Sequence, residues 1–224
     1  SAHTGVEDIL EYIDDTYVPG KSSHVKLLYL ENISDPARIL KHSLSLRSKG
    51  CRIAAIKSGT SEAGSRAASS HTGALASSDL AVDALFRKAG IIRCHSRSEL
   101  AAVAAVAMHR IAEGNRMVVI THAGGPAVML TDALSKNGFE VPAITGAKAE
   151  ELKAKLHPGS SVGNPVDFLA TGTAEQLGQI IDACDNDFDN IDSMAVIFGS
   201  PGLFAVDDVY KLPSEKMRSC KKPV

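Results

Sequence analysis

The sequence has no tryptophan, and aromatic residues make up only 4% of its 224 residues. Proteins that bind single-stranded nucleic acid stack bases on aromatic side chains, so the composition disfavours that class of partner. Neither sign of charge is in large excess, because the sequence has 24 lysines and arginines and 26 aspartates and glutamates, for a net charge of -2. Without a basic stripe to neutralise phosphates, we expect no nucleic-acid partner.

Long hydrophobic runs are missing as well. The longest run, residues 100–108, is mostly alanine and is too short to span a bilayer. No charged-then-apolar signal pattern begins the sequence, so we expect a cytoplasmic protein with no membrane partner. The cysteines are far apart and form no CxxC pair, which predicts reduced thiols rather than a disulfide or zinc framework. They are Cys51, Cys94, Cys184 and Cys220.

The two ends of the sequence predict a piece of a longer protein. The chain starts with serine rather than methionine, and Ser1-Ala2 resembles the remnant of a tag. The last four residues, 221–224, resemble the entry to a further buried strand. We therefore expect a fragment whose second domain is truncated at its C-terminus.

Short aliphatic runs alternate with helical patterns along the chain. The runs predict strands at 25–30, 52–57, 91–93, 116–121, 140–143 and 193–198. The helical patterns lie at 36–48, 80–89, 98–112, 127–136, 147–156 and 174–184. Asp35 is a candidate N-cap of the first of these helices, and the helix over 98–112 is apolar almost all round, which predicts burial. Such alternation is typical of parallel sheets covered by helices on both faces.

The alternation restarts near residues 113–116, which predicts a domain boundary there. The fold class is therefore α/β, with two flavodoxin-like domains of three layers and parallel sheets. The first would span residues 1–113 and the second residues 114–224.

A segment of about twenty small polar residues, 58–78, follows the second predicted strand. A loop of this length in a compact domain is usually functional or disordered. His71 lies in it beside Thr72 and Gly73, and small neighbours leave an imidazole accessible to a reacting group. A neutral imidazole can attack a phosphoryl or acyl group. The alternative is a surface histidine in a flexible loop.

The segment 121–127 reads as a strand end, a Gly124-Gly125 turn, and Pro126 in the first turn of a helix. Free amides and the positive end of a helix bind anions. The alternative is a plain tight connection, and the segment lacks the GxGxxG pattern of a dinucleotide site. The segment 161–167 is a third candidate for chemistry. Its Asn164-Pro165 predicts a fixed turn that Asp167 caps or hydrogen-bonds, and the alternative is a role in architecture alone.

Glu31 follows the first predicted strand directly. Ligands of parallel α/β sheets bind at the carboxyl ends of strands. Glu31, the segment after Lys57 and the turn after Thr121 all occupy such ends, although Glu31 alone could be an exposed loop acid. Surface roles are expected for the scattered histidines His24, His42, His95, His109 and His157. No zinc, Walker, GxSxG or EF-hand spacing is present.

Together these segments resemble the NDP-forming acyl-CoA synthetases, the group that includes ADP-forming acetyl-CoA synthetase and, more distantly, succinyl-CoA synthetase. The matching pieces span nearly the whole chain in family order. They are 27–33, 57–79, 121–134 and 161–167.

The resemblance implies roles for particular residues. His71 would be the phosphorylated histidine, and Glu31 the acid that holds and stabilises it. The phosphate would be bound by Ala123, Gly124, Gly125, Pro126, Thr72 and Gly73. The family usually has a small or amide residue, commonly asparagine, where this sequence has His122, and the role of His122 is open.

The resemblance also implies an acid–thiol ligase that interconverts acyl-CoA, NDP and phosphate with acid, CoA and NTP through a phosphohistidine relay. CoA, ADP or ATP and Mg²⁺ would bind the complete enzyme, and no cofactor or metal would bind this fragment. Its partners would be the CoA-binding and ATP-grasp domains of the same enzyme, a small carboxylic acid or acyl-CoA, and further copies in an oligomer. The fragment alone would be inactive. The alternative is a ligand-sensing regulatory region of a protein lysine acetyltransferase.

Overall fold

The computed structural model describes residues 4–72, 78–199 and 207–224, and the chain forms two compact units. The first unit is 1–109 and the second is 110–224, so the division falls after His109. The sequence placed the boundary slightly later, after Glu113. Each unit is described separately below.

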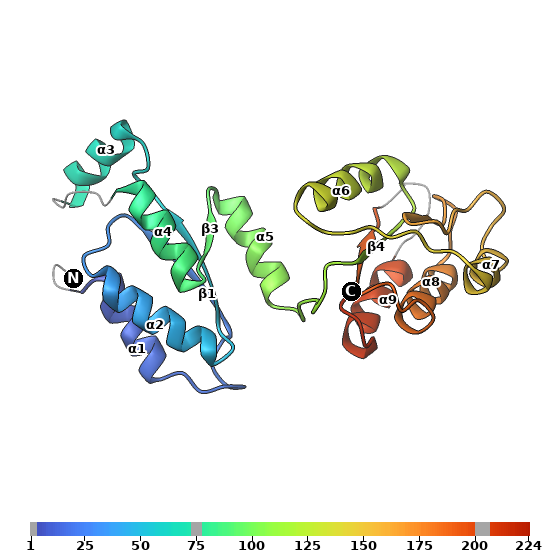
Figure 1. The fold of residues 1–224 in the computed structure, drawn as a ribbon, viewed down its shortest axis with the longest axis horizontal. Helices are drawn as coiled ribbons and strands as arrows, with labels where there is room; N and C mark the ends of the chain where they lie inside the picture. The colour runs from blue at the N-terminus through green and yellow to red at the C-terminus, as the bar shows by residue number, and fades with distance from the viewer. Residues whose placement is uncertain (1–3, 73–77, 200–206) are drawn as a thin grey trace. The chain divides into compact units, whose positions relative to one another are not determined.

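The first unit is built on three parallel strands in the order β1-β2-β3. Helices cover both faces of this sheet, with α1, α2 and α4 on one face and α5 on the other (Figure 1). The strands are β1 (Val25–Leu30), β2 (Arg52–Lys57) and β3 (Ile92–Cys94). The helices are α1 (Val6–Asp15), α2 (Pro36–Ser48), α3 (Glu62–Thr72), α4 (Asp79–Ala89) and α5 (Arg97–Ala107). This arrangement confirms the three-layer α/β prediction.

Local signals explain where two of these helices begin. The carboxylate of Asp35 accepts hydrogen bonds from the amides of Ala37 and Arg38, and Pro36 occupies the first position of α2. Ser96 caps α5 by accepting from the amide of Glu99. The candidate N-cap at Asp35 is thus confirmed.

The expected long loop after β2 was wrong, because most of it forms the helix α3. Three alanines in this segment favour a helix, and Glu62 carries negative charge in the first turn, where it is favourable. Arg66 lies one turn later and pairs with Glu62 at 2.9 Å. The small residues that suggested a loop are therefore compatible with a helix.

The expected burial of the alanine-rich helix was also wrong. In α5 only Ala107 is buried, and Val106 is 69% exposed. The helix also ends at Ala107 rather than at Ala112. Alanine buries little area on any side, so an apolar pattern made mostly of alanine does not require neighbours all round.

The second unit has a parallel sheet in the order β5-β4-β6, with α6 on one face and α7, α8 and α9 on the other (Figure 1). The strands are β4 (Met117–Thr121), β5 (Val166–Asp167) and β6 (Ser193–Ile197). The helices are α6 (Gly124–Lys136), α7 (Ala147–Lys153), α8 (Ala174–Asn186) and α9 (Asp207–Ser219). Alternate residues of β4 face the two layers, since Val119 packs with α6 while Val118 and Ile120 pack with the opposite core.

The expected strand over 140–143 does not form, and the segment makes one isolated bridge between Glu140 and Arg116. The side chain of Asn164 takes hydrogen bonds that a strand would have made. Its oxygen accepts from the amide of Val119 at 3.0 Å, and its nitrogen donates to the carbonyls of Met117 at 3.1 Å and Pro142 at 2.9 Å. The asparagine thus joins β4 to the segment beside it, which is an architectural role.

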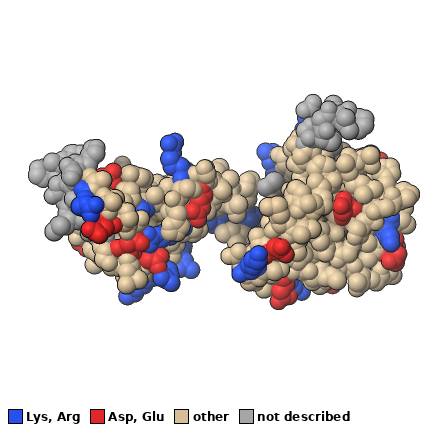
Figure 2. All heavy atoms as spheres, turned by 90° about the horizontal axis from the view of Figure 1, so that it is seen from above, with Lys and Arg blue, Asp and Glu red and all other residues tan. Residues whose placement is uncertain are grey.

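Basic and acidic side chains are mixed over the described part of the surface that Figure 2 shows, with no extended patch of one sign. The four cysteines are buried and unpaired. Within the described ranges, no helix has the length and apolar character needed to cross a membrane.

Candidate functional site

The carboxyl ends of β1 and β2 lie side by side in the first unit. Leu30 pairs with Lys57, and the amide of Ser58 donates to the carbonyl of Leu30 at 2.9 Å. Glu31, the next residue, is half-buried at this edge, and the hydroxyl of Tyr29 donates to its Oε1 at 3.5 Å. The sheet therefore places Glu31 next to the point where the chain departs toward His71.

His71 lies in the last turn of α3 rather than in a loop. The side chains of His71 and Thr72 fall outside the described part of the structure, as does Gly73 entirely. The predicted contact between Glu31 and the His71 imidazole therefore stays a prediction, as do the phosphate contacts of Thr72 and Gly73.

A close approach at Gly59 sets where α3 folds back. Gly59 has φ +68°, and a Cβ added there would lie 3.3 Å from the Cβ of Ala68 and 3.4 Å from the carbonyl oxygen of Gly64. The amide of Gly64 donates to the hydroxyl of Ser61 at 3.1 Å, which satisfies one free donor at the start of the helix. Glycine is needed here because the backbone is left-handed and the space is full.

Two cations lie at this end of the first sheet that the sequence did not single out. Lys57 is only 4% exposed and its Nζ donates to the carbonyl of Ser58. Arg93 pairs with Asp79 and Asp83 at the beginning of α4. Burial lowers the pKa of Lys57, the carboxylate of Asp79 opposes this, and the charge of Arg93 adds to the lowering. A lysine at the end of an apolar strand could have been noticed in the sequence. Arg93 could be identified only once the fold placed it beside α4.

The second unit has a helix N-terminus at the carboxyl end of β4. Ala123 is the N-cap of α6, and Gly124, Gly125 and Pro126 form its first turn. Among the described residues, no group accepts a hydrogen bond from the amides of Gly124 and Gly125. Both glycines are exposed, and a Cβ at Gly125 would meet nothing within 4 Å, so there is open space beside the first turn of α6. The helix begins earlier than expected, which moves both glycines from a preceding turn into the helix itself.

The imidazole of His122 bridges the start of α6 and the end of β6. Its Nδ1 lies 3.4 Å from the carbonyl oxygen of Ile197, and the amide of Gly199 donates to its Nε2 at 3.4 Å. Because Nε2 accepts, Nδ1 carries the proton of the neutral ring. The ring also stacks on Phe198, with centroids 4.4 Å apart.

Asp167 lies beside this helix start. Its Oδ1 accepts from the amide of Leu169 at 2.9 Å, and its Oδ2 would lie 3.6 Å from a Cβ at Gly124. Asp167 therefore fixes its own loop, as expected. It also leaves a negative charge near Gly124 at the start of α6.

No group of metal-binding side chains is found within residues 4–72, 78–199 and 207–224. His42, which we expected on the surface, is instead 3% exposed. Its Nδ1 lies 2.9 Å from Oδ2 of Asp14, and this contact joins α2 to α1. The expectation was wrong because the partner carboxylate lies on a helix that the sequence pattern did not predict.

Two family models match this chain in succession. Residues 1–107 match the succinyl-CoA ligase like flavodoxin domain, and residues 117–184 match the ligase-CoA domain. One match therefore lies in each structural unit.

Two of the curated relatives are named as ADP-forming CoA ligases. The chain is 34% identical over 168 residues to acetate–CoA ligase (ADP-forming) II subunit alpha of Pyrococcus furiosus, which covers 75% of the chain and 36% of that protein. It is 33% identical over 164 residues to 4-hydroxybutyrate–CoA ligase (ADP-forming) of Nitrosopumilus maritimus, covering 72% of the chain and 23% of that protein. The chain thus spans about a third or a quarter of these relatives.

A solved structure matches over nearly all of the chain. It is the dinucleotide forming acetyl-coenzyme A synthetase 1 of Ca. Korarchaeum cryptofilum in complex with phosphate and ADP. The TM-score is 0.83 at 25% identity, and the match covers 99% of this chain and 47% of that one. Two ligase domain models match the chain in succession, and ADP-forming CoA ligases are among its relatives. The chain therefore belongs to the NDP-forming acyl-CoA synthetase family.

Proposed function

We propose that this chain is the phosphohistidine-carrying part of an ADP-forming acid–CoA ligase, and that His71 relays the phosphoryl group. The observation that carries the proposal is the position of Glu31 at the carboxyl end of β1, beside the strand from which the His71 segment departs. A carboxylate at this point can hold one ring nitrogen and leave the other free to attack.

The reaction would proceed by three transfers. A phosphate oxygen attacks the thioester carbon of acyl-CoA, the C–S bond breaks, and CoA leaves as its thiol. A ring nitrogen of His71 then attacks the phosphorus of the acyl phosphate, the P–O bond breaks, and the carboxylate leaves. Finally an oxygen of the ADP β-phosphate attacks the phosphorus, the N–P bond breaks, and ATP forms. Each transfer is reversible, so the same residues serve synthesis of acyl-CoA.

The amides of Gly124 and Gly125 would bind a phosphate or phosphoryl group at the start of α6. Preorganised amides and the positive end of a helix favour negative charge without a metal ion at that position. Mg²⁺ would arrive with the nucleotide on another domain. CoA-binding and ATP-grasp domains of the complete protein would supply the other substrate sites. CoA and ATP are metabolites of the cytoplasm, which is the compartment we propose.

The relatives named above are ligases, which gives the regulatory acetyltransferase reading no support. A regulatory domain would need neither Glu31 nor a histidine on the segment after β2. The chain by itself is expected to show no turnover, since the nucleotide and CoA sites would lie on the rest of the enzyme.

Labelling of the complete enzyme with γ-³²P-ATP tests the relay. We expect label that is lost in acid and kept in base, as for phosphohistidine, and none in His71→Ala. His95→Ala is the matched control, since His95 is an exposed histidine of the same unit. Undiminished labelling and turnover in His71→Ala would refute the proposal and favour the regulatory reading.

A further inference from the structure

The segment that carries His71 leaves β2 after Lys57 and ends at Asp79, the first residue of α4. Arg93 contacts the downstream end of this segment, at Asp79. Its Nη2 lies 2.5 Å from Oδ1 of Asp79, and its Nη1 donates to the carbonyl of Asp79 at 3.4 Å. We infer that Arg93 is a positioning residue that fixes the downstream end of the His71 segment, an inference that rests on the proposed function.

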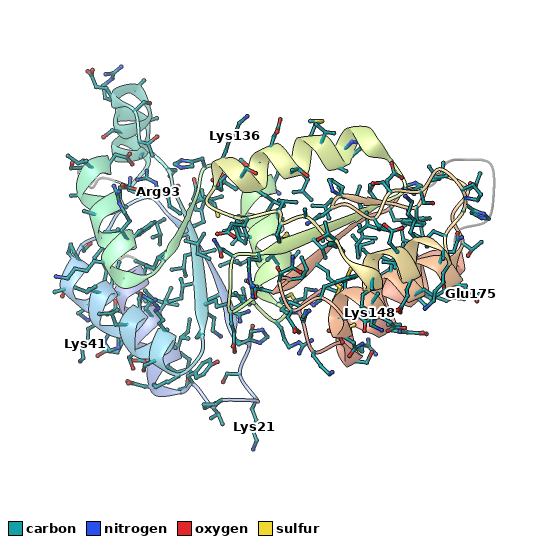
Figure 3. The ribbon with its side chains drawn as sticks, turned by 45° about the vertical axis from the view of Figure 1, so that its right-hand side comes forward. Lys21, Lys41, Arg93, Lys136, Lys148 and Glu175 are labelled. Carbon is teal, nitrogen blue, oxygen red and sulfur yellow. The ribbon has the colours of Figure 1, made fainter. Side chains whose placement is uncertain are left out.

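The guanidinium makes a third contact one turn further along the helix. Its Nη1 lies 3.3 Å from Oδ1 of Asp83, so Arg93 contacts the first two turns of α4 in three places. The Arg93 side chain is only 12% exposed. Figure 3 labels Arg93 beside the beginning of α4, and the residue comes from the strand β3. A planar fork can hold a carbonyl and a carboxylate together, whereas the ammonium of a lysine is a single point of charge.

The upstream end of the segment reaches the same small region. Lys57 is buried at the end of β2, two residues beyond Ala55, which pairs with Arg93 on β3. Burial lowers the pKa of Lys57, and the charges of Asp79 and Arg93 also act on it. Next to it, Gly59 packs against Ala68, which folds α3 back toward the strand from which it came. The two ends of the His71 segment therefore lie at one group of charges, in which Lys57 and Arg93 are the least exposed members.

Fixed ends restrict where the segment can carry the imidazole. Closing a chain on two fixed points removes conformational freedom from the residues between them. Phosphoryl transfer depends on a near-attack geometry, and a misplacement of about 1 Å can cost on the order of a hundredfold in rate. We therefore expect the rate of His71 phosphorylation to depend on Arg93, although Arg93 need not touch the substrate.

A purely structural role for Arg93 would have a different signature. It would lower the melting temperature and the amount of folded enzyme, but each folded molecule would react at the normal rate. Arg87 offers a matched control on the same helix. Its guanidinium pairs with Asp83 one turn away, it is 75% exposed, and it does not contact Asp79. Arg87→Ala thus removes an arginine from α4 and leaves the segment end intact.

The test is single-turnover labelling of the complete enzyme with γ-³²P-ATP, expressed per folded molecule. We expect Arg93→Lys and Arg93→Ala to slow phosphorylation by on the order of tenfold or more, with KM for ATP unchanged. Arg87→Ala should react at the wild-type rate. If Arg93 acts through Asp79, the double variant Arg93→Ala, Asp79→Ala should be no slower than the slower single variant.

Wild-type rates per folded molecule in Arg93→Lys and Arg93→Ala would overturn the inference, whatever happens to the melting temperature. A slower double variant would also overturn it, since Arg93 and Asp79 would then act independently. Labelling of His71→Ala in the same experiment distinguishes failure of the proposed relay from failure of the positioning role of Arg93. If His71→Ala still labels, the proposed relay fails. If only His71 takes label and the Arg93 variants are normal, the positioning role alone fails.

Discussion

The imidazole of His122 stacks on the ring of Phe198, with centroids 4.4 Å apart and an angle of 27° between the planes. The two residues follow neighbouring strands, β4 and β6. Nδ1 of His122 contacts the carbonyl of Ile197 at the end of β6, and Nε2 accepts from the amide of Gly199 just beyond it. The family resemblance implies a small or amide residue, commonly asparagine, at this position. An asparagine has no ring to stack, so the contact between the beginning of α6 and the end of β6 depends on the histidine.

His122→Asn should therefore destabilise the second unit rather than stop phosphoryl transfer. We expect a coupling free energy between His122 and Phe198 of about 0.5–1.5 kcal/mol, typical of an aromatic pair. A double-mutant cycle with His122→Asn and Phe198→Leu, followed by urea unfolding of the chain, measures it. Strictly additive effects would show that the stack contributes nothing.

Glu31→Gln should lower the amount of phosphohistidine in the complete enzyme to an intermediate level. The amide would keep the proposed hydrogen bond to the ring of His71 but would lose the charge proposed to stabilise the phosphorylated imidazole. Tyr29→Phe is the matched control, since it removes only the hydroxyl that lies 3.5 Å from Glu31. We expect the phenylalanine variant to stay within about twofold of wild type, because exposed contacts of this kind contribute little. Wild-type labelling in Glu31→Gln would remove Glu31 from the site.

Gly125→Glu should change stability and activity in opposite directions. A side chain at Gly125 meets open space, so it fits, and an acid in the first turn of α6 stabilises the helix by about 0.3–1 kcal/mol. The same charge repels a phosphoryl group at the helix start. We expect a higher melting temperature of the chain together with slower labelling of the complete enzyme. Gly125→Gln is the neutral control, and equal labelling by the two variants would exclude an anion site at these amides.

Asp14 should make the first unit sensitive to acid. Hydrogen bonds from Lys49, His42 and Ser45 keep the pKa of this buried carboxyl below its ordinary value, although burial by itself would raise it. A lowered pKa means that the stabilisation is complete above the unfolded value of 3.8 and is lost as pH falls through the folded value.

Asp14→Asn is therefore expected to cost about 2 kcal/mol at neutral pH, typical of hydrogen bonds to a charged group. The cost should shrink as pH falls below the unfolded pKa. Urea unfolding of the chain between neutral pH and the acid range measures both quantities. A penalty that is independent of pH would show that packing, and not the charge, is responsible.

Asn164→Leu should be among the most destabilising changes in the second unit. It removes three hydrogen bonds and leaves the amide of Val119 without its acceptor. An unpaired buried group alone costs about 1–3 kcal/mol. Asn137→Ala is the control, because its side chain makes one exposed hydrogen bond to the carbonyl of Ala133. Thermal unfolding of both variants compares them, and similar small losses would contradict the role given to Asn164.

Features that depend on neighbouring residues could be predicted from the sequence. The aliphatic runs of β1 and β2 were visible as strands, and Asp35-Pro36 marked the start of α2, because capping acts within three or four residues. The restart of the alternation indicated two α/β units. The family resemblance came from the residues around His71 and Gly124, and the family models and relatives confirm it.

Contacts between residues that are distant in sequence could be seen only in the tertiary structure. His42 is buried because Asp14 accepts its hydrogen bond from another helix, and Asn164 takes the place of a strand because the chain brings it back to β4. In the sequence, Arg93 and Asp79 look like ordinary surface charges. They form an ion pair because β3 lies beside the start of α4. Such side-chain hydrogen bonds form only after the backbone has brought remote segments together, so no local pattern of apolar, small or charged residues records them.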